Sequence, residues 1–282
     1  NVYAKILLAN GGHHDDSHYF TPGHYVITTP ITIKGQTITL GTLICEDVWS
    51  QDHERNLVKE IKQNGAELLV VLNQSFFYYG KQDLRKQMYQ DHASQNHIPI
   101  IAVNSIGVGD INKNFMIYDG GSMICMPNGR NWFTKQFEEE IDIVQLNDQG
   151  NIPGFSRGGV PIVTEKYDEI FQSLVFAQKH IFSDLGIGKA QVHVSGGIDS
   201  SVVLPIVVEA MGKENVIAIS NPSQYNGDVT KNNAQLLCDA LGVHLYWNEI
   251  GTVQTSLIDS HKKAFGEDSV KPLVVSTFDA VG

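Results

Sequence analysis

The order of apolar segments between Ala190 and Trp247 restricts the fold of this chain more than any other feature of its sequence. Three short segments rich in β-branched residues alternate there with two longer segments of helical spacing. The predicted strands are residues 190–194, 216–220 and 243–247, and the predicted helices are residues 200–211 and 230–241. Adjacent parallel strands need a crossover of about a dozen residues or more, which a helix of this length supplies. The order therefore predicts a βαβαβ unit with a parallel sheet.

A second region of mixed strand and helix patterns precedes this unit. Its predicted strands are residues 25–28, 37–44, 67–73, 98–104, 115–118 and 122–126, with a last strand at 137–146. Its predicted helices are residues 50–64, where Leu57 and Ile61 have helical spacing, and residues 82–96. Strands that alternate with helices indicate a layered α/β domain.

A stretch rich in glycine and proline separates the two regions, and residues 165–185 after it have the pattern of a long amphipathic helix. The chain has 282 residues, more than a typical domain of roughly 100–200. We therefore predict a first domain at residues 1–146, a linker at 147–164 and a second domain at 165–282. Because the chain starts at Asn1 and stops at Gly282 without a closing helix, we expect a piece of a longer protein, truncated at both ends.

The charge of the chain argues against nucleic acid and acidic membranes as partners. Its net charge is −11 and it has no cluster of Lys and Arg, whereas phosphate-rich surfaces are bound by clustered positive charge. No apolar run approaches the ~18 residues that cross a bilayer. Cys45, Cys125 and Cys238 are widely spaced and form no zinc or redox motif, which predicts a reducing, cytoplasmic compartment. Small molecules are the expected partners.

A glycine-containing loop connects the first strand and first helix of the βαβαβ unit. It comprises Ser195, Gly196, Gly197, Ile198, Asp199, Ser200 and Ser201. The glycines allow a tight turn that brings N–H groups near an oxyanion, and the serine hydroxyls lie at the positive end of the helix. Asp199 would repel phosphate unless Mg²⁺ lies between them. The loop is neither a Walker A motif nor a G-x-G-x-x-G motif, and an ordinary tight turn is the alternative.

The loop and its surroundings resemble the NAD synthetases of the N-type ATP-pyrophosphatase superfamily. The matching segments are Tyr167-Asp-Glu-Ile, the loop itself, Ala210-Met-Gly-Lys-Glu-Asn-Val and Asn221-Pro-Ser-Gln-Tyr225. The resemblance implies a Rossmann-like parallel-sheet domain of the adenine nucleotide α-hydrolase type. It assigns ATP binding to residues 195–201, to Ser223 and, with them, Tyr225, and Mg²⁺ binding to Asp199.

Cys45 follows the predicted strand at 37–44, a position from which an α/β layer can display a nucleophile. A lone cysteine is most often a small buried hydrophobic residue, whereas a reactive thiolate needs a base and a nearby cation, for which Lys5 is the candidate. The surrounding pattern resembles the nitrilase-type glutaminase domain of glutamine-dependent NAD synthetases. It consists of Lys5, Tyr19-Phe20-x-Pro22-Gly23, Leu43-Ile44-Cys45-Glu46-Asp47-Val48-Trp49, Asn73-x-Ser75, Gly80-Lys81, Arg85, Val103-Asn104 and Asp119-Gly120-Gly121-Ser122.

This second resemblance implies roles for four residues. Cys45 would be the nucleophile and Lys5 the group that stabilises the oxyanion, while Ser75 and Lys81 would bind glutamine. The family's general base is a glutamate on a strand ahead of this sequence. Three segments depart from the family: Leu-Pro-Asn-Tyr reads Leu8-Ala9-Asn10-Gly11, Asp-Glu reads Asp15-Asp16, and Asn-x-Ser-Pro reads Asn73-Gln74-Ser75-Phe76. Without the family's tyrosine at Gly11, the nitrogen donor is either glutamine or ammonia.

The two resemblances together predict a nitrilase-like α/β sandwich followed by a Rossmann-like domain. The expected reaction is ATP-dependent and Mg²⁺-dependent amidation of deamido-NAD to NAD through an adenylylated intermediate, with ammonia from glutamine hydrolysis, in a homo-oligomer. Another amidotransferase, a carbon–nitrogen hydrolase and a catalytically silent nucleotide-binding protein remain alternatives. The histidines at 13, 14 and 18 have no standard ligand spacing and, like Glu138, Glu139 and Glu140, are read as solvated surface.

Overall fold

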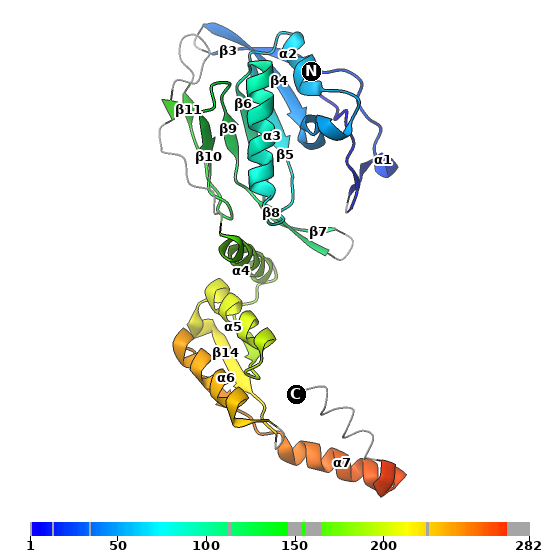
Figure 1. Ribbon diagram of the computed structural model, residues 1–282, viewed down its shortest axis with the longest axis vertical. Coiled ribbons are helices and arrows are strands. Elements are labelled where there is room, and N and C mark those ends of the chain that lie inside the picture. The colour runs from blue at the N-terminus through cyan, green and yellow to red at the C-terminus, as the bar shows by residue number, and fades with distance from the viewer. Residues whose placement is uncertain are drawn as a thin grey trace. The chain divides into compact units, whose positions relative to one another are not determined.

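The computed structural model describes residues 2–12, 14–33, 35–111, 114–145, 154–155, 165–223 and 226–269. It divides the chain into two compact units, Asn1–Ser173 and Leu174–Gly282. Figure 1 traces both from blue at the N-terminus to red at the C-terminus. Each unit is described by itself below.

The first unit is built on a six-stranded sheet with the order β10-β9-β6-β5-β4-β3. These strands are β3 (Thr28–Ile33), β4 (Gln36–Ile44), β5 (Leu68–Asn73), β6 (Ile100–Asn104), β9 (Met123–Cys125) and β10 (Asn131–Phe133). The central β4, β5 and β6 are parallel, and the outer pairs are antiparallel. The crossovers are α2 (Leu57–Gln63) and α3 (Lys81–Asn96), and α3 lies across the sheet in Figure 1.

Smaller elements complete the first unit. Two-stranded pairings join β1 (Asn10–Gly11) to β2 (His14–Asp15), β7 (Ile106–Ile111) to β8 (Asn114–Asp119), and β11 (Val144–Gln145) to β12 (Gly154–Phe155). The short helices are α1 (Asp16–Tyr19), η1 (Cys45–Val48) and η2 (Ser50–Asp52).

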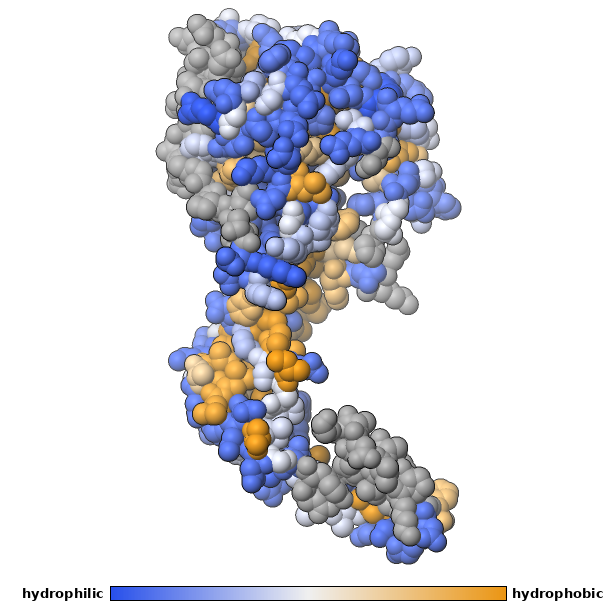
Figure 2. Space-filling view, in the orientation of Figure 1, coloured by the Kyte–Doolittle hydropathy of each residue, from blue (hydrophilic) through white to orange (hydrophobic). Residues whose placement is uncertain are grey.

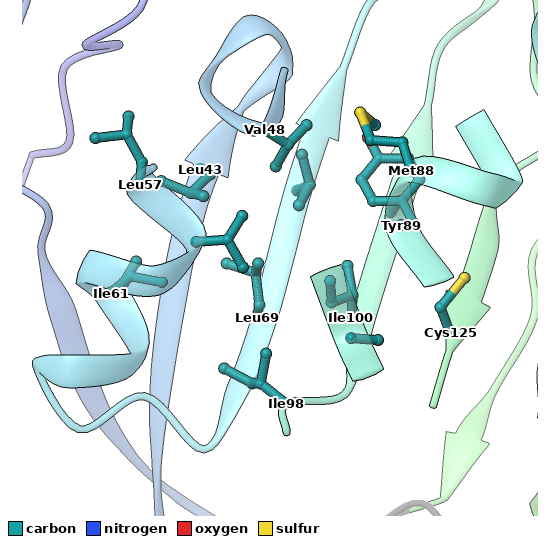
Figure 3. Packing of buried hydrophobic residues seen from close by; sticks show 14 of the residues in the cluster. Leu43, Val48, Leu57, Ile61, Leu69, Met88, Tyr89, Ile98, Ile100 and Cys125 are labelled. Atoms are coloured by element: carbon teal, nitrogen blue, oxygen red, sulfur yellow. The ribbon is translucent and has the colours of Figure 1, made fainter. Parts of the chain in front are cut away.

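The core of the first unit lies between the sheet and its two crossover helices. Leu43, Leu69 and Ile100 point from neighbouring strands, and Ile61 of α2 and Tyr89 of α3 meet them (Figure 3). Alternate residues of a strand point to one face, and residues four apart on a helix share a face, so both patterns bury one apolar surface. This core fixes the carboxyl ends of β4, β5 and β6, after which the candidate site residues follow.

The second unit contains a three-stranded parallel sheet with the order β13-β14-β15, which confirms the predicted βαβαβ unit. Its strands are β13 (Ala190–His193), β14 (Val216–Ser220) and β15 (Leu245–Trp247), and its crossover helices are α5 (Ile198–Met211) and α6 (Asp228–Leu241). Helix α4 (Lys166–Asp184) spans the division between the units; η3 (Lys213–Asn215), α7 (Gly251–Phe265) and η4 (Glu267–Ser269) are the remaining elements. Leu204, Ala218, Ala234 and Cys238 are fully buried between helices and sheet. Figure 2 shows hydrophobic residues gathered on the surface of the second unit.

Three predicted elements differ from the observed ones. The strand predicted at 25–28 begins at Thr28 and continues through Pro30, which β3 tolerates because it is an edge strand. The helix predicted at 50–64 begins only at Leu57, because the side chain of Asn56 accepts a hydrogen bond from the N–H of Lys59 and caps it. Of the strand predicted at 137–146, only Val144–Gln145 is a strand, and residue 146 lies outside the described residues.

No helix in the described part of the chain is both long enough and apolar enough to cross a membrane.

Candidate active site and phosphate loop

Cys45 is displayed at the point where β4 turns into η1. Its φ is 47°, in the left-handed region that residues other than glycine rarely adopt. Such conformations cluster at active sites, where the surrounding structure holds the strain. Cys45 is half-buried, whereas Cys125 and Cys238 are fully buried in the two cores. Cys45 is therefore the cysteine placed to react.

Three groups around Cys45 oppose the effect of burial on its thiol. Burial raises the pKa of Cys45 above its usual value, while the charge of Lys5, a backbone hydrogen bond from Gln74 and the charge of Lys81 pull it down. The net shift of the pKa is upward, so the thiol is protonated at neutral pH. Attack by this sulfur requires a base that removes the proton as the bond forms.

Lys5 is held by an acidic residue to which the sequence pattern assigned no role. Its Nζ lies 2.5 Å from Oδ2 of Asp16, and the same oxygen accepts the N–H of Ala9 at 3.1 Å. Burial alone would raise the pKa of Asp16, but the hydrogen bonds from Lys5 and Ala9 outweigh it and lower the pKa. An ionised Asp16 thus fixes the ammonium group whose charge acts on Cys45. The acidic pair Asp15-Asp16 was the available signal in the sequence.

Asp47 connects the segment that carries Lys5 to the turn that carries Cys45. Its side chain is fully buried, and its Oδ1 accepts the N–H groups of Ile6 at 2.9 Å and Leu7 at 2.8 Å. Its Oδ2 accepts the N–H of Ile44 at 3.0 Å and the hydroxyl of Tyr3 at 2.7 Å. A buried carboxylate with four donors is strongly directional. Asp47 therefore sets the position of Lys5 relative to Cys45.

The structure also brings Lys81 to this side of the sheet. Lys81 is the first residue of α3, and its Nζ lies 4.3 Å from the ring centroid of Trp49 and 4.9 Å from that of Tyr78. Burial, and then the charge of Arg85, lower its pKa. Lys81 and Cys45 each influence the pKa of the other, which places the two groups in one electrostatic environment.

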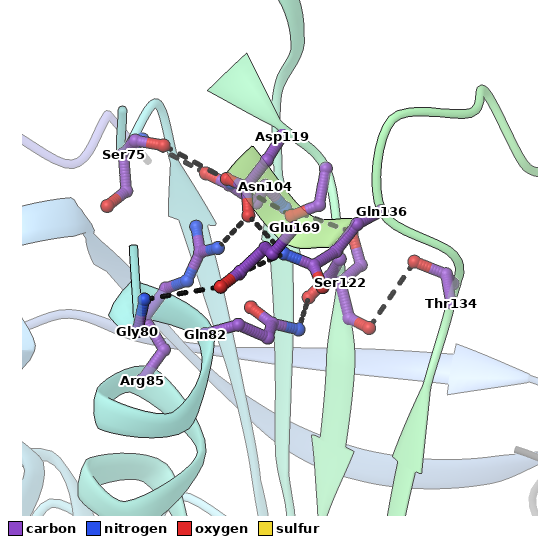
Figure 4. A network of polar contacts seen from close by, with 12 residues as sticks. Ser75, Gly80, Gln82, Arg85, Asn104, Asp119, Ser122, Thr134, Gln136 and Glu169 are labelled. Carbon is purple, nitrogen blue, oxygen red and sulfur yellow. Dashed lines mark hydrogen bonds and ion pairs between the residues drawn. The ribbon is translucent and has the colours of Figure 1, made fainter. Parts of the chain in front are cut away.

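Ser75 precedes Lys81 in the chain, and hydrogen bonds from Asn104 hold its backbone in place. The Oδ1 of Asn104 accepts the N–H of Ser75 at 3.0 Å, and its Nδ2 donates to the carbonyl of Ser75 at 3.3 Å. The same Nδ2 donates to Oδ1 of Asp119 at 3.3 Å, and Asp119 also forms a buried ion pair with Arg85 (Figure 4). Residues 75–81 thus begin at an anchored backbone; because the resemblance predicts that Ser75 and Lys81 bind the amide substrate, we call residues 75–81 the amide-binding segment.

The phosphate loop of the second unit follows β13 and opens α5. Gly196 has a φ of +82°, and a Cβ there would lie 1.9 Å from the carbonyl oxygen of Thr230. The hydroxyls of Ser200 and Ser201 donate to the carbonyl of Gly197 at 3.1 and 2.9 Å. The N–H of Gly197 donates to Oγ of Ser195 at 3.2 Å. Only glycine fits at position 196, and the loop places its N–H groups at the start of a helix of 14 residues.

Ser223 follows β14, so it lies with the loop at the carboxyl edge of the same parallel sheet. Its N–H and Oγ both donate to Oδ1 of Asn226, at 2.7 and 3.1 Å. Tyr225 lies outside the described residues. Within the described chain no group of three or more His, Cys, Asp or Glu residues could hold a metal ion. Mg²⁺ can instead be held by a single carboxylate together with the phosphates of a bound nucleotide. Asp199, in the first turn of α5, is a carboxylate suited to that arrangement.

Two family models match the chain. The carbon–nitrogen hydrolase model matches residues 1–150, and the NAD synthase model matches residues 170–272. Among similar proteins, the glutamine-dependent NAD(+) synthetase of Synechocystis sp. is 30% identical over 266 residues, 90% of this chain and 45% of that protein. The one from Thermotoga maritima is 29% identical over 295 residues, 94% of this chain and 50% of that protein. The chain thus spans about half the length of the relatives it matches.

Two solved structures have the same fold. The glutamine-dependent NAD+ synthetase of Acinetobacter baumannii, in complex with ADP, has a TM-score of 0.81 and 30% identity, with 94% of this chain and 48% of that chain covered. The glutamine-dependent NAD(+) synthetase of Cytophaga hutchinsonii has a TM-score of 0.70 at 16% identity, with 92% and 49% covered, and supports the fold alone. The predicted fold, a nitrilase-like α/β domain followed by a parallel-sheet synthetase domain, is confirmed.

Proposed function

The chain belongs to the carbon–nitrogen hydrolase family and continues into an NAD synthase domain, and from this we propose that it makes NAD with nitrogen taken from glutamine. In this proposal the first unit hydrolyses glutamine, and the second unit uses ATP and the released ammonia to amidate deamido-NAD. The observation that carries the proposal is Cys45, held at a positive φ with the charges of Lys5 and Lys81 acting on its sulfur.

In the first unit, the sulfur of Cys45 forms a bond to the amide carbon of glutamine while its proton passes to the general base. The resemblance assigns that base to a glutamate ahead of Asn1. Lys5 stabilises the negative charge that develops on the amide oxygen, and Asp16 and Asp47 hold Lys5 in place. The carbon–nitrogen bond then breaks, and the base returns the proton to the leaving nitrogen, which departs as ammonia. Water hydrolyses the thioester to glutamate and restores the thiol.

Binding of glutamine in this scheme uses both ends of the amide-binding segment. Lys81 offers a cation to the substrate's α-carboxylate, and Ser75 offers a hydroxyl close to the sheet edge. Burial lowers the pKa of Lys81, and the carboxylate of a bound amino acid would raise it again. A charged pair in a half-buried setting favours amides that carry a carboxylate over simple aliphatic amides.

In the second unit, the N–H groups and hydroxyls of residues 195–201 bind the β- and γ-phosphates of ATP. Mg²⁺ held by Asp199 would neutralise phosphate charge when bound. The nicotinate carboxylate of deamido-NAD attacks the α-phosphorus and pyrophosphate leaves, which gives an adenylate. Ammonia then displaces AMP and forms the amide. Ser223, at the end of the neighbouring strand, would contact the nucleotide from the same sheet edge.

The test uses the full-length protein and replaces Cys45 with Ala. NAD formation is measured with ATP, Mg²⁺ and deamido-NAD, and with either glutamine or ammonium as the nitrogen donor. Loss of the nucleophile should lower glutamine-driven turnover by more than about a thousandfold and leave ammonium-driven turnover intact. Cys238→Ala, in the core of the second unit, is the matched control and should keep glutamine use.

The other outcomes are equally informative. Glutamine use that survives Cys45→Ala would remove Cys45 as the nucleophile. Wild-type activity with ammonium alone would show that the segment with Ala9 and Gly11 does not support glutamine hydrolysis. No activity with either donor would leave another amidation reaction or a silent nucleotide-binding protein.

A further inference from the structure

We propose that Glu169 of helix α4 is a positioning residue for glutamine hydrolysis, acting by fixing both ends of the amide-binding segment. The inference rests on the proposed function and adds to it a residue that neither the cysteine motif nor the phosphate loop includes. Glu169 lies in α4, which begins in the first unit and continues past Ser173 into the second.

Glu169 is buried where its neighbours on the helix are not. Its side chain is 2% exposed, whereas Lys166, Tyr167 and Asp168 in the same turn are exposed. Burial of a carboxylate is costly unless donors replace water. Two donors offset part of this cost: the N–H of Gly80 lies 3.4 Å from Oε2, and Nε2 of Gln136 lies 3.4 Å from Oε1 (Figure 4). Burial still outweighs them and raises the pKa of Glu169 above its usual value. Both donors belong to the first unit.

The first donor is the residue at the N-terminus of α3. Gly80 has a φ of 81° and no side chain with which to cap the helix. The carboxylate of Glu169 accepts the N–H of this N-cap residue and lies at the end of a helix of 16 residues, where the dipole favours a negative charge. The next residue is Lys81, whose ammonium group lies against Trp49. Glu169 therefore fixes the turn from which Lys81 extends.

The second donor leads to the other end of the segment. The Nε2 of Gln136 also donates to Oδ2 of Asp119 at 3.0 Å, and Asp119 accepts a hydrogen bond from Asn104. Asn104 in turn holds the backbone of Ser75 on both sides. Glu169 thus closes one continuous set of hydrogen bonds that contacts the segment at Ser75 and at Gly80. Because both predicted glutamine ligands depend on it, loss of its charge should weaken glutamine binding more than the chemical step.

The test compares Glu169→Gln with Asp168→Asn in the full-length protein. Glutamine retains the volume of Glu169, but its amide cannot accept both donors and carries no charge. Glu169→Gln should raise the KM for glutamine roughly threefold to tenfold and change kcat by less than about twofold. Ammonium-driven NAD formation should stay at the wild-type rate. Asp168→Asn removes an exposed charge from the same turn and should leave all three quantities unchanged.

A second variant disturbs the same helix end from the other side. Gly80→Ala has open space for its Cβ but strains the backbone at positive φ, and should raise the KM for glutamine while sparing ammonium use. The inference is overturned if both variants keep the wild-type KM, or if ammonium-driven activity falls in parallel with glutamine use. The wild-type assay tests the proposed function separately: a wild-type protein that does not hydrolyse glutamine would refute that function. The two variants test only the role of Glu169.

Discussion

Replacement of Asp47 with Asn should detach Lys5 from the Cys45 turn at a large cost in stability. Asn can keep its Oδ1 on the N–H groups of Ile6 and Leu7, and its NH2 group then faces the N–H of Ile44, for which it offers no acceptor. An unsatisfied buried N–H costs about 1–3 kcal/mol, and loss of the charge weakens the remaining bonds by about 1 kcal/mol each. The expected loss is about 3–5 kcal/mol, a large part of the 5–15 kcal/mol typical of a domain.

Hydrogen exchange reports this change at the residues concerned. The amides of Ile6 and Leu7 are protected by Asp47, so a weakening of about 3 kcal/mol should speed their exchange on the order of a hundredfold where exchange follows local opening. Urea unfolding followed by far-UV circular dichroism gives the matching loss in the stability of the first unit. Glutamine-driven turnover should fall together with the protection, because Lys5 is no longer held near Cys45.

Tyr3→Phe is the matched control for this prediction. It removes one of the four donors to Asp47 and leaves the three backbone N–H groups in place, so it should cost about 1 kcal/mol and keep most of the activity. The reasoning is refuted if Asp47→Asn costs less than Tyr3→Phe, or if the amides of Ile6 and Leu7 stay protected.

Three further perturbations test other parts of the site. Gly196→Ala places a Cβ 1.9 Å from the carbonyl oxygen of Thr230 and should abolish ammonium-driven NAD formation. Gly188→Ala has open space for its Cβ and should leave that activity unchanged, so equal activities of the two variants would contradict the prediction. Lys5→Met removes a charge that lowers the pKa of Cys45, so the pH profile of alkylation by iodoacetamide should move to higher pH; an unmoved profile would show that Lys5 does not act on the sulfur. The pKa of Asp16 is lower in the folded protein than in the unfolded chain, where it is about 4. The ionised carboxylate therefore stabilises the fold at pH values above about 4, and this stabilisation is lost as the pH falls through the lowered pKa of the folded state. Urea unfolding should therefore show Asp16→Asn less stable than the wild type at pH 7 and approaching it below about pH 4; a constant difference would exclude this ionisation as the cause.

The parts of the fold that the sequence predicted are those with local periodic signals. The parallel strands β13, β14 and β15 have apolar runs between helices of clear spacing, and the structure pairs them in the predicted order. The strand predicted at 25–28 overlaps β3 only at Thr28. The edge position that lets β3 run through Pro30 becomes visible only when the sheet is assembled. The late start of α2 depended on Asn56, a capping residue that lies inside the predicted range.

The same distinction applies to the candidate site. The phosphate loop is one continuous stretch of sequence, and so is the turn at Cys45. The residue types within each stretch indicate its chemistry. The hydrogen bonds that position the first-unit site join residues far apart in sequence: Asp47 of the Cys45 turn bonds to Ile6 across 41 residues, and Glu169 bonds to Gly80 across 89. A single sequence carries no signal for such pairs, because an Asp or Glu residue is written the same way whether its side chain is buried or exposed to solvent. The tertiary fold has to be known before either can be assigned.

The buried ion pair between Arg85 and Asp119 shows what this positioning costs. Arg85 is 2% exposed and Asp119 is fully buried, and Nε and Nη1 of Arg85 have no hydrogen-bond partner among the described residues. A buried pair with unmet donors is a poor source of stability, and apolar side chains of similar volume often replace such pairs without loss. Asp119 uses its other lone pairs on Asn104 and Gln136, which hold Ser75 and Glu169. We infer that the pair is explained by the geometry it imposes on the amide-binding segment, and that Asp119 is the point where the anchors of Ser75 and of Lys81 meet.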